Sequence, residues 1–300
     1  MTRRARTFGR ARGLTRGLRL LELGLARVYG NGWPASLARR LGLQPDPVLR
    51  AHAFTLAARA ARDMSRPPLR VGFASDFHAG PVTHPLVIAR ACALLADARP
   101  DVLLLAGDFV SLHARHVDTL LPLLAAIPAP LGRYAVLGNH DLVGDDRYIA
   151  ERLTSAGVQV LTNRAVALAA PHDDVWICGL DDPTRGHPER GAAALDDVPD
   201  TAGARLVLMH SPDGLLALGA RAFDAAFCGH THGGQVVLPS GIALVAPEGR
   251  LSRRFLHGVY RLGPRGERTL LVSGGVGCST IPARVLVRPE VHVVLMRGDP

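Results

Sequence analysis

The chain of 300 residues is 48% hydrophobic, which is enough apolar side chain for one large core or two small ones. Its glycines and prolines are spread along the chain, which excludes a low-complexity protein. No window approaches the roughly 20 apolar residues of a membrane-spanning helix, so we expect none. The net charge of +9 comes from arginine alone, because the chain contains no lysine.

The positive charge is concentrated in the first 66 residues. That segment contains 14 arginines and only three acidic residues, Glu22, Asp46 and Asp63, for a net charge of +11. The rest of the chain therefore carries −2 of the total of +9. A basic segment on a near-neutral body predicts an anionic partner, either nucleic acid or acidic lipid headgroups.

Residues 10–28 have the pattern of an amphipathic helix. One face would be apolar (Leu14, Leu18, Leu21, Leu25, Val28) and the other cationic (Arg12, Arg16, Arg19, Arg27). This arrangement is typical of a helix that lies in a membrane interface, with its guanidinium groups near lipid phosphates. The alternative is a helix that packs its leucine face on the main domain.

A second helix is predicted over Val48–Met64, followed by a natural boundary at Pro67-Pro68. We therefore divide the chain into a basic, amphipathic, helical segment, residues 1–66, and a main domain, residues 67–300. Arginines interrupt any hydrophobic leader near the N-terminus. The expected location is cytoplasmic, with peripheral contact to the inner face of the cell membrane.

From Leu69 onward, short apolar runs alternate with helical patterns. The clearest strands are predicted over Leu69–Ser75, Val102–Ala106, Tyr134–Leu137, Val175–Leu180, Arg205–Met209 and Ala225–Cys228. Helices are predicted over Pro85–Ala96, His116–Ala126 and Arg147–Ala156, and further strands over Val259–Leu262, Thr269–Val272 and Val291–Met296. Strands that alternate with helices predict a layered α/β domain.

The four cysteines lie far apart and form no Cys-x-x-Cys pair. We expect buried free thiols in a reducing compartment. This spacing favours free thiols over a disulfide framework.

Polar residues with metal-ligand chemistry follow five of the predicted strands. The motifs are Asp76-Phe77-His78, Gly107-Asp108, Gly138-Asn139-His140-Asp141, Met209-His210 and Gly229-His230-Thr231-His232-Gly233-Gly234-Gln235. Sites in α/β sheets form at the carboxyl ends of strands, so these side chains are expected to converge. Any one of the motifs is weak, because a strand-end Asp or Asn is often a helix cap or a turn residue.

The residue types predict a site for transition-metal ions. Carboxylate oxygen with imidazole nitrogen suits Mn, Fe, Zn, Co or Ni, and argues against Ca. Asp76 and His78 are two residues apart, as are His230 and His232. If the extended conformation persists beyond each strand, both members of a pair project from the same side.

With these five motifs, the chain from about Leu69 to its C-terminus resembles the calcineurin-like metallophosphoesterase superfamily. The resemblance implies a four-layer α/β/β/α sandwich of two mixed sheets. It also implies a centre of two divalent metal ions, and manganese is the metal that we favour. Asp76, His78 and His232 would hold one ion, Asn139, His210 and His230 the other, and Asp108 would bridge them. His140 would act on the leaving oxygen, with Asp141 orienting it.

A closer resemblance is carried by Gly-His-Thr-His-Gly-Gly-Gln, by Gly179-Leu180-Asp181-Asp182-Pro183 and by Ile281-Pro282-Ala283-Arg284. These resemble a bacterial phosphodiesterase branch that includes a UDP-2,3-diacylglucosamine pyrophosphatase. The implied activity is hydrolysis of a phosphodiester or pyrophosphate in a lipid-linked or nucleotide-linked substrate. The chain departs from that branch at Val272-Ser273-Gly274-Gly275, where an Arg or Asn often follows the Ser.

Two other functions remain as alternatives. The first is a soluble phosphodiesterase or nuclease whose basic arm binds nucleic acid, although the arm has few aromatic residues for base stacking. The second is a non-catalytic scaffold, although such proteins lose ligands and none is missing here. No obligate protein partner is expected.

Overall fold

The computed structural model describes residues 24, 27–56, 67–111, 113–244 and 248–298. Most of the amphipathic segment predicted over residues 10–28 therefore lies outside the described residues. No helix among the described residues is both long enough and apolar enough to cross a membrane.

The first sheet has six strands. Their order is β1 (Val48–Leu56), β12 (Glu290–Gly298), β2 (Leu69–Ala74), β3 (Val102–Leu105), β4 (Arg133–Ala135) and β5 (Val158–Val160). Strands β2 to β5 run parallel, β12 runs antiparallel to β2, and β1 runs parallel to β12. The sheet is therefore mixed, as expected.

The second sheet also has six strands and is also mixed. Their order is β10 (Gly258–Leu262), β11 (Arg268–Val272), β9 (Ala225–Cys228), β8 (Ala204–Leu208), β7 (Val175–Gly179) and β6 (Arg164–Ala167). The four central strands run parallel, and β10 and β6 pair antiparallel at the two edges.

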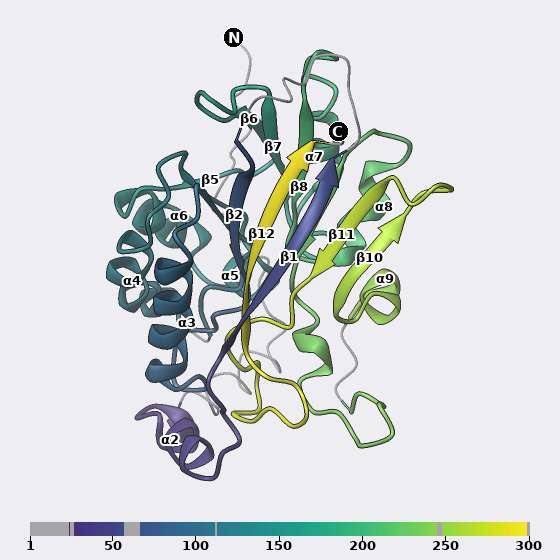
Figure 1. The fold of residues 1–300 in the computed structure, drawn as a ribbon. Helices are drawn as coiled ribbons and strands as arrows, with labels where there is room; N and C mark the ends of the chain where they lie inside the picture. Colours follow the sequence, from purple (N-terminus) through teal and green to yellow (C-terminus); the bar gives the residue numbers. More distant parts are fainter. Residues whose placement is uncertain (1–23, 25–26, 57–66, 112, 245–247, 299–300) are drawn as a thin grey trace.

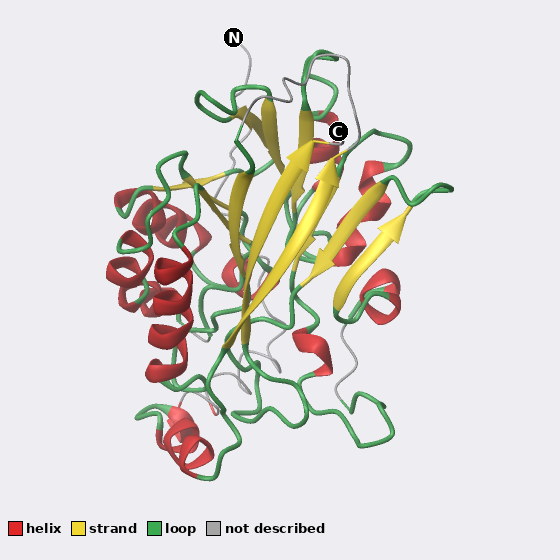
Figure 2. Cartoon of the chain, in the orientation of Figure 1, coloured by secondary structure: helices red, strands yellow, loops and turns green. Residues whose placement is uncertain are grey.

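The sheets pack face to face over an apolar core, in which the Phe73 and Phe227 rings lie 5.3 Å apart at their centroids. The outer face of the first sheet is covered by α3 (Pro85–Ala98), the 3-10 helix η1 (Ala114–Thr119), α4 (Leu121–Ala125) and α6 (Asp146–Ser155). The outer face of the second is covered by α7 (Pro188–Ala193) and α8 (Leu215–Leu218). The predicted four-layer α/β/β/α sandwich is confirmed (Figures 1 and 2).

Several short helices of the described residues lie outside these layers. They are α2 (Trp33–Arg40), α5 (Asn139–Val143), α9 (Arg250–Arg254) and the 3-10 turns η2 (Pro212–Gly214) and η3 (His232–Gly234). All four cysteines are buried and free, as predicted. Burial raises the pKa of the Cys92 thiol to about 12, so this side chain is an apolar filler and not a nucleophile.

The helix predicted from Val48 is wrong over Val48–Leu56, which forms strand β1. This strand pairs along its whole length with β12, from Val48 opposite Glu290 to Leu56 opposite Gly298. Phe54 and Leu56 alternate with exposed residues and enter the core between the sheets. The alanine-rich run that follows favoured the helical prediction, and residues 57–66 lie outside the described residues.

Glu290, at the start of β12, joins three separate parts of the fold. Its carboxylate accepts hydrogen bonds from Arg50 Nε on β1 (2.8 Å) and from the backbone N–H of Gly274 (2.8 Å). His257 Nε2 lies 2.7 Å from the same carboxylate. Burial opposes the charged form of Glu290, but hydrogen bonds from His257 and His292 hold its pKa well below its usual range.

Glu290→Gln should therefore destabilise the protein by about 2 kcal/mol at neutral pH, since it removes a buried charge from its cationic partners. A depressed pKa contributes stability above the unfolded-state value, here 4.5, and that contribution is lost as the pH falls below it. Urea unfolding at pH 7 and at successively lower pH should show the difference from wild type shrinking in acid. A difference independent of pH would contradict this account.

Phe54→Ala tests whether β1 belongs to the body of the protein. Because Phe54 is buried against Phe227, its truncation should cost about 3–5 kcal/mol in the free energy of unfolding. The matched control is Leu49→Ala on the same strand, which should cost less than about 1 kcal/mol because Leu49 is exposed. Equal, small effects of both substitutions would show that the strand contributes little to the fold.

Candidate metal centre

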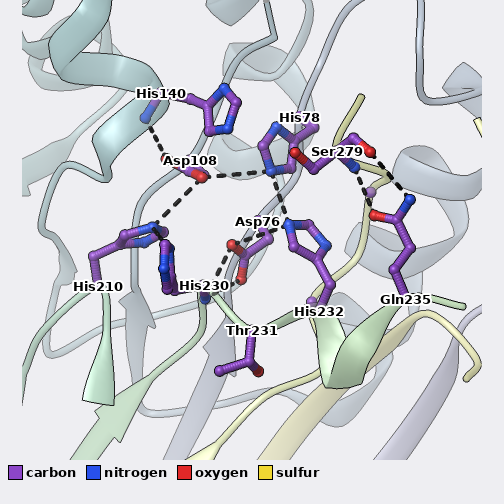
Figure 3. A network of polar contacts seen from close by, with 12 residues as sticks. Asp76, His78, Asp108, His140, His210, His230, Thr231, His232, Gln235 and Ser279 are labelled. Atoms are coloured by element: carbon purple, nitrogen blue, oxygen red, sulfur yellow. Dashed lines mark hydrogen bonds and ion pairs between the residues drawn. The ribbon is translucent and has the colours of Figure 1, made fainter. Parts of the chain in front are cut away.

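The five polar motifs converge at one end of the two sheets. Their side chains follow β2, β3 and β4 of the first sheet and β8 and β9 of the second (Figure 3). The loop after β2 is held against the loop after β3, since Asp76 N–H donates to Gly107 O (2.9 Å) and His78 N–H donates to Asp108 O (3.0 Å). Gly229 N–H donates to His210 O (2.8 Å), which holds the loops after β8 and β9 together.

The backbone at these positions is not extended, contrary to our expectation for the two-residue spacings. Five of the candidate ligands adopt the left-handed conformation: Asp76 (φ 54°), His78 (φ 43°), Asp108 (φ 52°), His230 (φ 72°) and His232 (φ 51°). Each costs roughly 1–2 kcal/mol for a residue with a Cβ atom. The side chains converge because the loops curl inward, and not because a strand pattern continues.

Two glycines are required by the close approach of neighbouring loops. A Cβ atom on Gly138 would lie 2.2 Å from Asp108 Oδ1, and one on Gly229 would lie 2.1 Å from Asp76 Oδ2. Any larger residue at either position would displace a carboxylate from the centre.

One group of ligand atoms is formed by His78, His232 and Asp76. His78 Nε2 lies 3.1 Å from His232 Nε2, and His232 Nε2 lies 3.7 Å from Asp76 Oδ1. The backbone N–H of His230 donates to both oxygens of Asp76 at 3.1 Å, which fixes that carboxylate. The three residues are buried and together could hold a metal ion.

A second group is formed by Asn139, His210 and His230. Asn139 Oδ1 lies 3.0 Å from His210 Nε2 and 3.1 Å from His230 Nδ1, and the two nitrogens are 3.2 Å apart. Ligands that occupy adjacent positions around one ion, each about 2.1 Å from it, lie about 3 Å from one another. The three atoms therefore have the spacing of three ligands on one face of a cation.

Asp108 lies between the two groups. Its Oδ2 atom is 3.4 Å from His78 Nε2 in the first group and 3.4 Å from His210 Nε2 in the second. Its other oxygen, Oδ1, accepts a hydrogen bond from His140 N–H (2.9 Å). The structure thus brings together all seven side chains that the sequence singled out, in the two groups that the family resemblance implied.

The protonation states of two histidines suit metal binding. His210 Nδ1 lies 2.7 Å from the carbonyl oxygen of Ala106, which can only accept, so Nδ1 carries the hydrogen and Nε2 offers a lone pair. His78 Nδ1 lies 3.0 Å from Ser111 Oγ, which leaves its Nε2 directed at the first group. Hydrogen bonds at the second ring nitrogen commonly orient metal-bound histidines.

The electrostatics of the centre also fit a cation. Burial lowers the pKa of His78 to about 3, so this imidazole is neutral and available as a ligand. Burial, reinforced by repulsion from Asp108, raises the pKa of Asp76 to about 6. Burial opposes protonation of His210, but the carboxylate of Asp108 raises its pKa well above the usual value. The negative charge that favours this proton would equally favour a metal ion.

His140 lies beside the centre, with its ring edge-to-face on His78 at 4.8 Å between centroids. Asp141 does not act as expected, because its hydrogen bonds join it to backbone and not to the His140 ring. The fully buried carboxylate accepts from the N–H groups of Phe109 (2.9 Å), Val110 (3.3 Å) and Gly138 (3.0 Å). Asp141 therefore fixes the loops after β3 and β4, and supports His140 only through the backbone.

Sequence reasoning placed three further residues outside the ligand set and gave them no role at the centre. Ser111 contacts His78, and Arg284 is buried with its guanidinium 3.3 Å from His232 Nδ1. Asp182 is buried with one carboxylate oxygen that lacks a hydrogen-bond partner. Asp182 and Arg284 do lie in the Gly179–Pro183 and Ile281–Arg284 motifs that carry the closer family resemblance, which were the available signals, whereas Ser111 lies in no quoted motif.

The family model for calcineurin-like phosphoesterases matches residues 69–234. The chain is 34% identical over 235 residues to the phosphodiesterase YaeI of Escherichia coli, which covers 76% of this chain and 82% of that protein. It is 29% identical over 207 residues to the uncharacterised metallophosphoesterase YkuE of Bacillus subtilis, which covers 67% of this chain and 70% of that protein.

Among solved structures, the 5'-nucleotidase precursor of Thermus thermophilus aligns with 18% identity and a TM-score of 0.44, over 76% of this chain and 54% of that one. Residues 69–234 include the loops that build the centre. The chain belongs to the calcineurin-like phosphoesterases, which hydrolyse phosphoesters with divalent metal ions.

Proposed function

We propose that the seven converging side chains hold two divalent metal ions, and that the protein hydrolyses a phosphodiester or pyrophosphate in a lipid-linked or nucleotide-linked substrate at a membrane surface. The mutual spacing of the ligand atoms is the observation that supports this most directly. Asn139, His210 and His230 are 3.0 to 3.2 Å apart, and Asp108 is equidistant from both groups.

The charge of such a centre suits a phosphoester substrate. Two divalent ions would contribute +4, while Asp76 and Asp108 contribute −2 and the other proposed ligands are neutral. The remaining positive charge would attract phosphate oxygens. Bound divalent ions lower the pKa of water towards 7, which supplies a nucleophile at neutral pH, and they stabilise charge on the phosphoryl oxygens. No serine or cysteine nucleophile is required.

His140 is the residue best placed to protonate the leaving oxygen. Its backbone N–H is bound to Asp108, and its half-buried ring packs on His78 without belonging to either ligand triad. An alkoxide leaves poorly without a proton, so a positioned acid contributes roughly 10²- to 10⁴-fold to the rate.

The arginine-rich N-terminal segment supports a membrane-associated substrate. Residues 1–26 contain seven arginines and one glutamate, and would be attracted to anionic lipids on the cytoplasmic face of the membrane. A substrate such as UDP-2,3-diacylglucosamine would meet both requirements, because it combines a pyrophosphate with acyl chains. We favour manganese as the metal because oxygen and imidazole ligands are both present.

His140→Ala should separate metal binding from catalysis. We expect the variant to retain two divalent ions per chain by elemental analysis, and to lose roughly 10²- to 10⁴-fold in kcat on bis(p-nitrophenyl) phosphate. The matched control is His187→Ala in the loop before α7, which should keep both properties. Asn139→Ala should instead lose about one ion per chain, because it removes one of the three ligands of the second group.

Two outcomes would contradict the proposal. A purified wild type that retains one transition-metal ion or none after equilibration with manganese would exclude the dinuclear centre. Two bound ions without hydrolysis of any phosphoester in a broad panel would favour the scaffold function.

Deleting residues 1–26 tests the N-terminal segment. The shortened chain should lose the salt-sensitive part of its binding to vesicles of phosphatidylcholine and phosphatidylglycerol, because that part depends on the arginines. Hydrolysis of the soluble diester should persist, since the deletion leaves strand β1 intact. An unchanged salt dependence of binding would show that the segment makes no membrane contact.

A further inference from the structure

Exposed apolar side chains are concentrated at one end of the molecule. Fifteen large hydrophobic residues are exposed in the described part of the chain, and eleven of them lie in four short segments, residues 33–44, 80–86, 236–244 and 279–288. We call these segments the apolar end. Its exposed residues are Trp33, Leu37, Leu41, Leu43, Leu86, Leu238, Ile242, Leu244, Ile281, Val285 and Leu286.

Two buried glutamines join the four segments into one surface. Gln44 donates to Val82 O (2.8 Å) and Pro282 O (2.9 Å), and its side-chain oxygen accepts from His84 N–H (2.9 Å). Gln235 donates to Ser279 O (3.0 Å) and Ile281 O (2.9 Å). The segments are therefore neighbours in space and are held in fixed positions.

The apolar end lies at the same end of the sandwich as the metal centre. Strand β12 ends at the top of Figure 1, and β2, which runs antiparallel to it, ends at the bottom. Helix α2 also lies at the bottom. Segment 80–86 begins two residues after His78, and segment 236–244 begins directly after Gln235 of the His230 motif. Gly277 N–H is bound to Asp76 O, just before segment 279–288 begins.

The charge of the apolar end is entirely positive. Its four segments contain Arg39, Arg40, Arg284 and Arg288, and no Asp or Glu, whereas the chain from Pro67 onward carries −2 overall. The arginine-rich residues 1–26 enter the fold close to α2, through Arg27 and Val28. Arg284 is buried and Arg39 is paired with Asp46 just beyond segment 33–44, so Arg40 and Arg288 are the exposed arginines of this surface. Exposed apolar residues beside such arginines match the surface of an anionic bilayer.

Two features of single residues agree with contact to lipid. Trp33 is 51% exposed, yet its indole N–H is already bound to Val28 O (2.9 Å), so it presents an apolar ring. Leu286 is 69% exposed and adopts a left-handed backbone conformation, φ 59°, which is unfavourable for leucine. Between α2 and the loop that begins at Gly80 lies a pocket of about 480 Å³, partly lined by Ala35, Ile88 and Leu123.

We propose that the apolar end docks on an anionic lipid bilayer and presents the metal centre to phosphate groups at the headgroup level. This rests on the proposed function and adds a second contact to that of residues 1–26. Insertion of apolar side chains supplies the part of binding that salt does not weaken. The docked orientation would favour substrates embedded in the bilayer over soluble ones.

The test uses the full chain with Ile242→Asp and Leu286→Asp combined. Asp tolerates the left-handed conformation at position 286 better than Leu, so this change does not add backbone strain. The matched control is Leu216→Asp on α8, because Leu216 is 61% exposed and lies outside the apolar end. Partitioning is measured on vesicles of three parts phosphatidylcholine to one part phosphatidylglycerol, in about 0.5 M salt to screen the arginines.

We expect the double variant to partition at least tenfold less than wild type, since each lost apolar contact is worth on the order of tenfold. The control should be unchanged. Turnover of the soluble diester should be retained in both variants, which shows that they are folded. If the proposed function is wrong, the wild type itself will show no turnover or no bound metal. If the double variant and the wild type partition equally, the docking surface alone is overturned.

A fluorescent probe distinguishes docking from attachment by residues 1–26 alone. Both variants are made in a Trp33→Phe background. Brominated lipid should quench the fluorescence of the tryptophan introduced by Leu286→Trp, and should not quench that of the tryptophan introduced by Leu216→Trp. Equal quenching at both positions would overturn the proposed orientation. If the wild type is a dimer in the absence of lipid and the double variant is a monomer, a second copy of the chain covers this face instead.

Discussion

Two buried carboxylates, Asp76 and Asp108, impose the main constraint on this structure. Asp76 follows strand β2 and Asp108 follows strand β3, and both side chains are buried. In the described part of the chain, the ion-pair partners of both carboxylates are histidines. Burial of like charges side by side is unfavourable, as the raised pKa of Asp76 shows. A divalent cation bound between these carboxylates would offset this cost. The left-handed loop conformations and the close-packed glycines are consistent with the same requirement, because they place ligands at the cost of local backbone strain.

The fold was predictable where one pattern dominated. Strands such as β2 and β8 are mainly apolar runs followed by a polar turn, and each was placed to within two residues. Strand β1 was not, because Val48–Leu56 is followed by an alanine-rich run that favours a helix, and its partner β12 is some 240 residues away. Short strands such as β5, three residues long, carry too little pattern to be recognised.

The ligands were predictable because metal chemistry restricts residue type at each position. Asp76, Asn139 and His230 are chemically distinctive, and each directly follows or lies close behind a predicted strand. The support around them was not predictable in the same way. Arg284 bonds to Gly277 O and approaches His232, but it lies in an apolar loop where any arginine would appear solvent-exposed. Asp141 shows the opposite error, since its proximity to His140 in sequence suggested a contact that the backbone geometry does not make.

The same supporting residues link the centre to the apolar end. Gln235 terminates the His230 motif and binds the backbone of Ser279 and Ile281, while the backbone N–H of Arg284 donates to Leu43 O at 2.7 Å. The Gln235 side chain is itself buried, which reduces the competition of water for its hydrogen bonds. A short series of hydrogen bonds therefore connects residues 279–288 with His232, through Gln235 in the same loop and through Arg284. The residues that would bind metal and those of the apolar end consequently share the same short segments of chain, so a substitution in residues 279–288 can alter both.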